Sequence, residues 1–107
     1  MMNSGIKAAS MILLAASFAM PALAQTSGEA VYKAKCALCH GADGLANTPA
    51  AKSMKVLSFK DPTMLKASDA RFALTTRNGE GKMPAYNGKL TDAQIKDVIA
   101  YIRTLQK

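Results

Sequence analysis

The residues in this sequence best suited to carry out chemistry are two cysteines and a histidine in the segment Cys36-Ala37-Leu38-Cys39-His40. Two thiols three positions apart, followed directly by an imidazole, form the pattern of a c-type haem attachment site. The thiols can form thioethers with the two vinyl groups of one porphyrin, and the imidazole can ligate its iron. His40 is the only histidine, and Cys36 and Cys39 are the only cysteines. The spacing therefore predicts one covalently bound haem c, with His40 as an axial ligand.

Three other kinds of site could use the same residues. A dithiol redox motif is expected near alternating strands and helices, and no strand-rich segment flanks Cys36. A structural zinc site needs four Cys or His ligands, whereas the chain contains three such residues. A structural disulfide would suit an oxidising compartment. Haem attachment is favoured over all three.

A second candidate ligand lies late in the chain, in the glycine-rich segment 79–86. This segment presents Met83 directly before Pro84. A thioether sulfur is a soft ligand for haem iron, and a His/Met pair raises the reduction potential. Methionine more often fills gaps in a core, and Met54 and Met64 lie in segments with helical periodicity, where packing is the more usual role. The sequence therefore favours Met83 as the second axial ligand.

A helix is expected to deliver the attachment motif. Thr26 and Glu29 have the spacing of a capping box, which predicts a helix start. Gly28, Tyr32 and Cys36 then follow at four-residue steps, which places them on one helical face. The helix should end at Cys36, and the chain should leave the helical conformation along the attachment motif.

The clearest helix is the last one in the chain. Thr91 and Gln94 predict a capping box, and Leu90 with Ile95 fits a hydrophobic staple. Tyr101 lies beside the apolar stripe and could pack crosswise on the Gly28 face of the first helix, because glycine allows two backbones to approach. The stripe has helical spacing and comprises Ile95, Val98, Ile99, Ile102 and Leu105.

Short helices are expected between these two. They are predicted at 50–56, at 62–65 with an Asp61-Pro62 start, and from Ser68 or Asp69 to Asn78. Pro49 is a candidate to hold a carbonyl that accepts a hydrogen bond from the His40 ring, since a ligating imidazole usually donates its second N–H. The expected core residues of this region are Leu57, Phe59, Phe72 and Leu74.

The first segment has the features of a secretory signal peptide. Lys7 precedes an apolar run, and Ala22-Leu23-Ala24 has the small-residue pattern of a cleavage site. The domains are therefore predicted as a removed signal peptide at 1–24 and one small domain at 25–107. The chain has a formal net charge of +7, and removal of Lys7 lowers this by one. Export argues against nucleic acid as a partner, and the scattered basic residues favour an acidic partner protein.

Taken together, these residues resemble a small bacterial class I cytochrome c. The resemblance rests on Cys36-x-x-Cys39-His40, on Gly28 and Tyr32 before it, on the methionine loop and on the terminal helix. It implies an all-α fold of four to five short helices around one haem, with the N- and C-terminal helices packed crosswise. It also implies His40 and Met83 as axial ligands. The sequence has no tryptophan, which many relatives place near a propionate, so the propionate candidates are chosen by position alone: Arg77, Asn78 and Tyr86.

The function expected is single-electron transfer by a soluble, monomeric periplasmic protein with no membrane insertion after signal removal. With both axial positions filled, substrate has no vacant site on the iron, which leaves electron transfer rather than enzymatic catalysis. The alternative is a haem enzyme or gas sensor with an open sixth position. Redox partner proteins with acidic docking surfaces could be steered by Lys35, Lys52 and Lys82.

Overall fold

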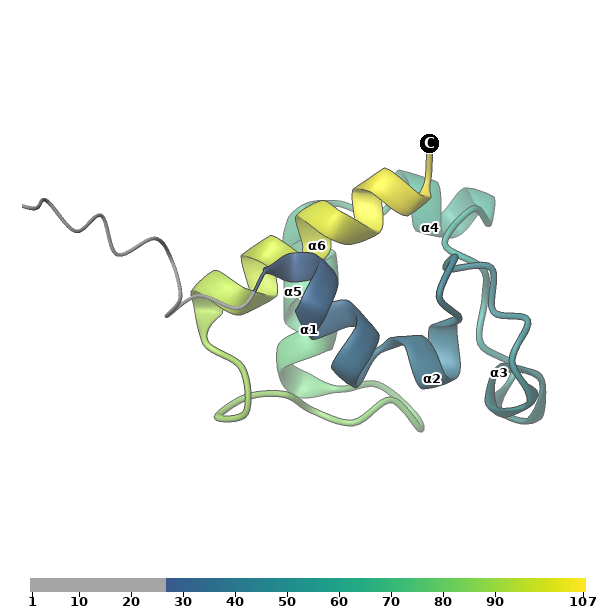
Figure 1. Ribbon diagram of the computed structural model, residues 1–107, viewed down its shortest axis with the longest axis horizontal. Helices are drawn as coiled ribbons and strands as arrows, with labels where there is room; N and C mark the ends of the chain where they lie inside the picture. Colours follow the sequence, from purple (N-terminus) through teal and green to yellow (C-terminus); the bar gives the residue numbers. More distant parts are fainter. Residues whose placement is uncertain (1–26) are drawn as a thin grey trace, which may run out of the picture.

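The computed structural model describes residues 27–107, which form six helices and no strand. The predicted all-α class is confirmed. The predicted signal peptide at 1–24 lies outside the described residues. One helix more than expected is present, because Cys36 interrupts the first helix and leaves a separate short turn after it. The helices, labelled in Figure 1, are α1 Gly28–Lys35, α2 Ala37–His40, α3 Pro49–Met54, α4 Pro62–Lys66, α5 Asp69–Asn78 and α6 Asp92–Leu105.

The first and last helices pack directly against each other (Figure 1). A β-carbon at Gly28 would lie only 2.1 Å from the carbonyl oxygen of Asp97, so only glycine fits at this crossing. Further along α1, the Tyr32 ring packs against Tyr101 of α6, with 5.3 Å between the ring centroids. The crosswise packing expected from Gly28, Tyr32 and Tyr101 is confirmed.

Within residues 27–107, every helix except α2 begins at a residue whose side chain caps it; Cys36, which precedes α2, makes no side-chain capping bond. The capping box predicted at α6 is confirmed, with Thr91 and Gln94 each bonding the other's backbone. The start of α1 differs from the prediction, because Ser27 rather than Thr26 is the N-cap and accepts the Ala30 N–H at 3.1 Å. A side-chain oxygen satisfies a backbone N–H that has no partner within the helix. The N-cap residues are Ser27, Thr48, Asp61, Ser68 and Thr91.

Helices α2, α3 and α5 end where the backbone turns to positive φ, at Gly41, Lys55 and Gly79. Helix α3 ends earlier than the expected residue 56, because Lys55 adopts the left-handed conformation with φ 58°. It also starts at Pro49, whose fixed φ suits the first position of a helix. Helix α5 ends at Asn78, as expected, and Gly79 follows with φ 75°. Glycine tolerates this conformation without a steric penalty.

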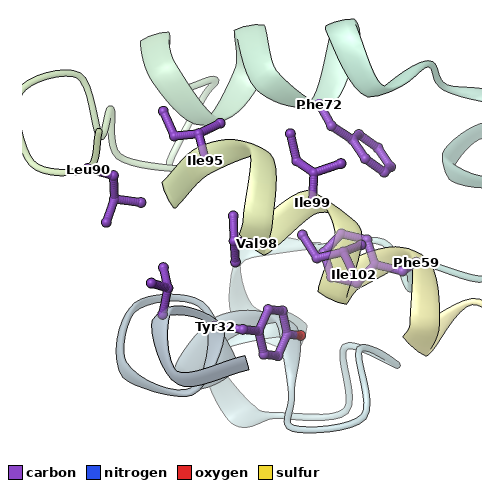
Figure 2. Packing of buried hydrophobic residues seen from close by; sticks show 9 residues of the cluster. Tyr32, Phe59, Phe72, Leu90, Ile95, Val98, Ile99 and Ile102 are labelled. Atoms are coloured by element: carbon purple, nitrogen blue, oxygen red, sulfur yellow. The ribbon is translucent and has the colours of Figure 1, made fainter. Parts of the chain in front are cut away.

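The buried core lies between α1, α5 and α6, with Phe59 contributed by the segment before α4 (Figure 2). Three aromatic rings meet in it, since Phe59 lies 6.4 Å from Tyr32 and 6.2 Å from Phe72, centroid to centroid. The apolar stripe of α6 faces these rings, as the helical spacing predicted. Its buried members are Ile95, Val98, Ile99 and Ile102.

Two of the expected core residues are on the surface. Phe59 and Phe72 are buried, but Leu57 is 49% exposed and Leu74 is 47% exposed, so the core prediction was wrong for both leucines. Leu74 lies two positions after Phe72, which places it about 200° around the helix and away from the buried face. Leu57 follows the left-handed turn at Lys55, in a non-helical segment between α3 and α4.

Candidate haem site

The attachment motif lies on one short stretch of nearly helical backbone. The Cys36 N–H donates to the Tyr32 carbonyl at 2.8 Å, and the His40 N–H donates to the Cys36 carbonyl at 2.9 Å. Residues three and four positions apart share a helix face, so Cys36, Cys39 and His40 are directed to the same side. Both cysteines are free, half-buried thiols, which does not support the disulfide alternative. Burial and then the neighbouring Cys39 thiol raise the pKa of Cys36 to about 11.

The His40 ring lies in an apolar environment. It stacks on Phe59 with 4.7 Å between ring centroids and 16° between ring planes. Burial lowers the pKa of His40, which favours the neutral imidazole that can ligate a metal. Its Nδ1 atom is buried and has no hydrogen-bond partner among residues 27–107. A buried polar atom left unpaired costs about 1–3 kcal/mol, so a partner for this nitrogen, either a hydrogen-bond acceptor or a metal ion, would stabilise the site.

The backbone around His40 is held by hydroxyl groups from other parts of the chain. The buried Tyr32 hydroxyl donates to the Gly41 carbonyl at 2.6 Å. The Thr48 hydroxyl donates to the Cys39 carbonyl at 2.9 Å. These two bonds attach both sides of the histidine to helix α1 and to the start of α3. Sequence reasoning missed Thr48, although its position before Pro49 is a typical N-cap signal.

The expected hydrogen bond from the His40 ring to a carbonyl held by the Pro49 turn is not formed. The Nδ1 atom of His40 makes no hydrogen bond in the described part of the chain. Pro49 occupies the first position of α3, where its ring stabilises the helix start. A role for Pro49 in orienting the imidazole stays a prediction.

One cleft brings part of the attachment motif together with the methionine loop, although Cys39 is not among the residues that line it. Cys36, His40 and Met83 all line it, and the empty space, including the open mouth, is about 470 Å³. The remaining lining is apolar or carries short hydroxyl side chains, which suits the largely apolar face of a porphyrin; it comprises Phe59, Met64, Phe72, Thr75, Thr76, Val98 and Ile102.

Of the two methionines that compete with Met83 as the sulfur ligand, only one lines the cleft. Met54 is not among the lining residues, whereas Met64 of α4 is. Met64 also packs against the buried core cluster, which is the usual role of methionine. Met83 lies instead on the loop between α5 and α6.

Sequence reasoning missed Thr75 and Thr76, which line the cleft, although they lie three and four positions after Phe72 and therefore share its helix face.

The Met83 loop, residues 79–90, is anchored to the end of α5. The Met83 N–H donates to the Glu80 carbonyl at 2.9 Å, and the Tyr86 N–H donates to the Thr76 carbonyl at 3.0 Å. A β-carbon at Gly79 would lie 2.7 Å from the Met83 carbonyl oxygen, so glycine is required for this close approach. The loop therefore holds Met83 against α5 without a strand or a helix of its own.

Two of the three propionate candidates have other partners in the structure. Arg77 pairs with Asp92 at 3.3 Å. The Tyr86 hydroxyl donates to the Lys35 carbonyl at 3.0 Å. Asn78 is exposed at the last position of α5. None of the three is among the residues that line the cleft, so their propionate role stays a prediction.

Comparison with known proteins gives the family. Residues 23–102 match the family model described as "Cytochrome C oxidase, cbb3-type, subunit III". The chain belongs to the c-type cytochrome family. The cytochrome c6 of Picosynechococcus sp. (strain ATCC 27264 / PCC 7002 / PR-6) is 36% identical over 94 residues, covering 79% of this chain and 78% of that protein. The cytochrome c6 of Nostoc sp. (strain PCC 7120 / SAG 25.82 / UTEX 2576) is 40% identical over 87 residues, covering 79% and 76%.

A solved structure shares the fold. The KustC0563 c-type cytochrome superimposes with a TM-score of 0.70 at 27% identity, covering 77% of this chain and all of that one (100%). This cytochrome is therefore a small class I, mono-haem protein with one covalently bound haem c, and it is an electron carrier rather than an enzyme. Within residues 27–107, no helix is long and apolar enough to cross a membrane.

Proposed function

We propose that this cytochrome is a periplasmic single-electron carrier whose haem iron is held by His40 from one side and by Met83 from the other. The observation that supports this most strongly is the cleft, since Cys36, His40 and Met83 line the same apolar space. When bound, the haem supplies a one-electron couple between ferric and ferrous iron. Cys36 and Cys39 provide the thioether sulfurs, and the neutral His40 ring provides the nitrogen ligand.

The surroundings of the cleft suit electron transfer better than catalysis. Phe59, Phe72 and Val98 line it with apolar surface that excludes water. The low polarity of the cleft and a sulfur ligand both favour the reduced haem, which carries less charge, and so raise its reduction potential. Two protein ligands leave no vacant position for a substrate, which is why the haem enzyme or gas sensor is the weaker alternative.

The proposal also includes export to the periplasm and docking with an acidic partner protein. The Lys7 segment with its Ala-x-Ala pattern supports secretion to the periplasm, where haem is attached to c-type cytochromes. Lys35, Lys52 and Lys82 are all exposed, which leaves them free to steer an acidic partner protein. Charge steering is screened by salt, with a Debye length of about 8 Å at physiological ionic strength. The second-order rate constant with a redox partner, measured by stopped flow, should therefore fall as salt is added; a rate independent of salt would remove the steering role.

The decisive experiment combines mass spectrometry and optical spectroscopy of the exported protein. We expect the mass of the chain from residue 25 onward plus one haem, and a weak far-red band in the ferric state that reports sulfur ligation. We also expect the ferrous protein not to bind carbon monoxide at neutral pH. Ready binding of carbon monoxide would favour the open-site alternative, and a colourless protein of polypeptide mass would contradict haem attachment altogether.

A further inference from the structure

The Met83 loop forms hydrogen bonds with α5 on one side and with α1 on the other, and the two sets of bonds differ in kind. Toward α5 it makes backbone hydrogen bonds, from Tyr86 to the Thr76 carbonyl and from Asn87 to the Arg77 carbonyl, both 3.0 Å long. Toward α1 and α2, the helices that carry the attachment motif, the described residues show one hydrogen bond from this loop. It runs from the Tyr86 hydroxyl to the Lys35 carbonyl at 3.0 Å, across 51 positions of sequence.

The position of that bond connects the two halves of the haem site. Lys35 is the last residue of α1 and directly precedes Cys36. Tyr86 lies three positions after Met83, at the point where the loop turns toward α6, and its carbonyl accepts the Lys89 and Leu90 N–H groups at 2.9 and 3.0 Å. The side chain that makes the bond therefore comes from a hydrogen-bonded turn in the loop that carries Met83.

The tyrosine ring itself is well placed to hold this contact. It is half-buried and packs against the buried core cluster. Burial raises the pKa of the Tyr86 hydroxyl, so it stays protonated and able to donate at neutral pH. The Lys35 carbonyl is one of the last carbonyls of α1, which lack a partner within the helix and accept hydrogen bonds from outside it.

We propose that Tyr86 is a positioning residue that keeps the Met83 loop closed over the haem cleft, through its hydrogen bond to the Lys35 carbonyl. The inference rests on the proposed assignment of Met83 as an axial ligand. Opening the loop must break this bond, so the bond adds to the free energy of releasing the methionine. Tyr86 thereby sets how readily an external ligand can displace the sulfur, without contacting the iron itself.

The test is displacement of Met83 by imidazole, titrated into the ferric protein and followed by loss of the far-red band. Tyr86→Phe keeps the ring and removes the hydroxyl. Since one intramolecular hydrogen bond contributes modestly, the apparent imidazole affinity should rise roughly two- to tenfold. Hydrogen exchange at the Met83 amide should accelerate by a similar factor, and this readout does not involve the haem.

Tyr101→Phe is the matched control. Tyr101 is also half-buried and also packs against the core cluster, but its hydroxyl makes no hydrogen bond to the described residues. It lies on α6, away from the loop. Imidazole affinity should be unchanged in this variant. A rise equal to that of Tyr86→Phe would show a general loosening and would overturn the proposal.

A double variant separates failure of this inference from failure of the ligand assignment. In Met83→Ala there is no sulfur to release, so adding Tyr86→Phe should change imidazole affinity no further. If Met83→Ala keeps the far-red band, the axial assignment is wrong and the positioning role of Tyr86 fails with it. If Met83→Ala loses the band while Tyr86→Phe leaves imidazole affinity unchanged, only the role of Tyr86 is overturned. An equal effect of Tyr86→Phe with and without Met83 would also overturn it.

Discussion

Replacing Met83 with alanine is expected to lower the reduction potential of the haem on the order of 0.1 V, within the roughly 0.8 V that axial ligands span. A methionine sulfur stabilises ferrous iron, and its loss favours the ferric state. Cys36, Cys39 and His40 are untouched, so the haem should stay covalently attached. The variant should lose the far-red band and bind carbon monoxide when reduced. Potentiometric titration with optical detection measures the reduction potential and shows whether the far-red band is present.

Met64 provides the comparison for this experiment. It lines the same cleft as Met83 and has the same thioether, but it lies on α4 and packs against the core. Truncating a buried methionine side chain to alanine costs about 2–5 kcal/mol, which sets the upper limit for Met64→Ala. The far-red band should persist in this variant. If Met64→Ala abolishes the band and Met83→Ala does not, the sulfur ligand is Met64.

Replacing Gly28 with alanine is expected to be the most destabilising single methyl addition on the surface shared by α1 and α6. The new β-carbon would lie 2.1 Å from the Asp97 carbonyl oxygen and 2.6 Å from its carbonyl carbon. Both atoms belong to helical backbone, so neither can move aside as a flexible side chain would. Overpacking of this kind costs about 3 kcal/mol or more, which is a large part of the roughly 5–15 kcal/mol that stabilises a typical domain.

Denaturant unfolding of the ferric protein measures this loss. The control is Gly88→Ala, since a β-carbon at Gly88 would meet no atom within 4 Å. Gly88 has φ 83°, so its substitution introduces backbone strain alone, worth about 1–2 kcal/mol. A loss for Gly28→Ala no greater than that for Gly88→Ala would contradict the close backbone contact between α1 and α6.

Local patterns in the sequence were sufficient for the attachment motif and for most helix boundaries. Cys36, Cys39 and His40 are adjacent in the chain, so their chemistry depends on spacing that no distant contact can alter. Capping works over the same short range, and the starts of α4 and α6 are where their sequences predicted. At α1 the neighbouring Ser27 took the capping role expected of Thr26, because two adjacent hydroxyl residues differ little in local preference.

Tertiary packing decided which side chains reach the cleft and which partners they find. Leu57 and Leu74 are apolar yet half exposed, whereas Thr76 is polar and buried, because packing against neighbouring segments decides which side chains face inward. Arg77 and Tyr86 have suitable chemistry for a propionate, but in the fold they contact Asp92 and the Lys35 carbonyl. The sequence by itself therefore determined that a haem is attached and roughly where helices begin. Only the tertiary structure brought His40, Met83 and the Phe72 face of α5 around one space, because contacts between residues far apart in the chain leave no local pattern to read.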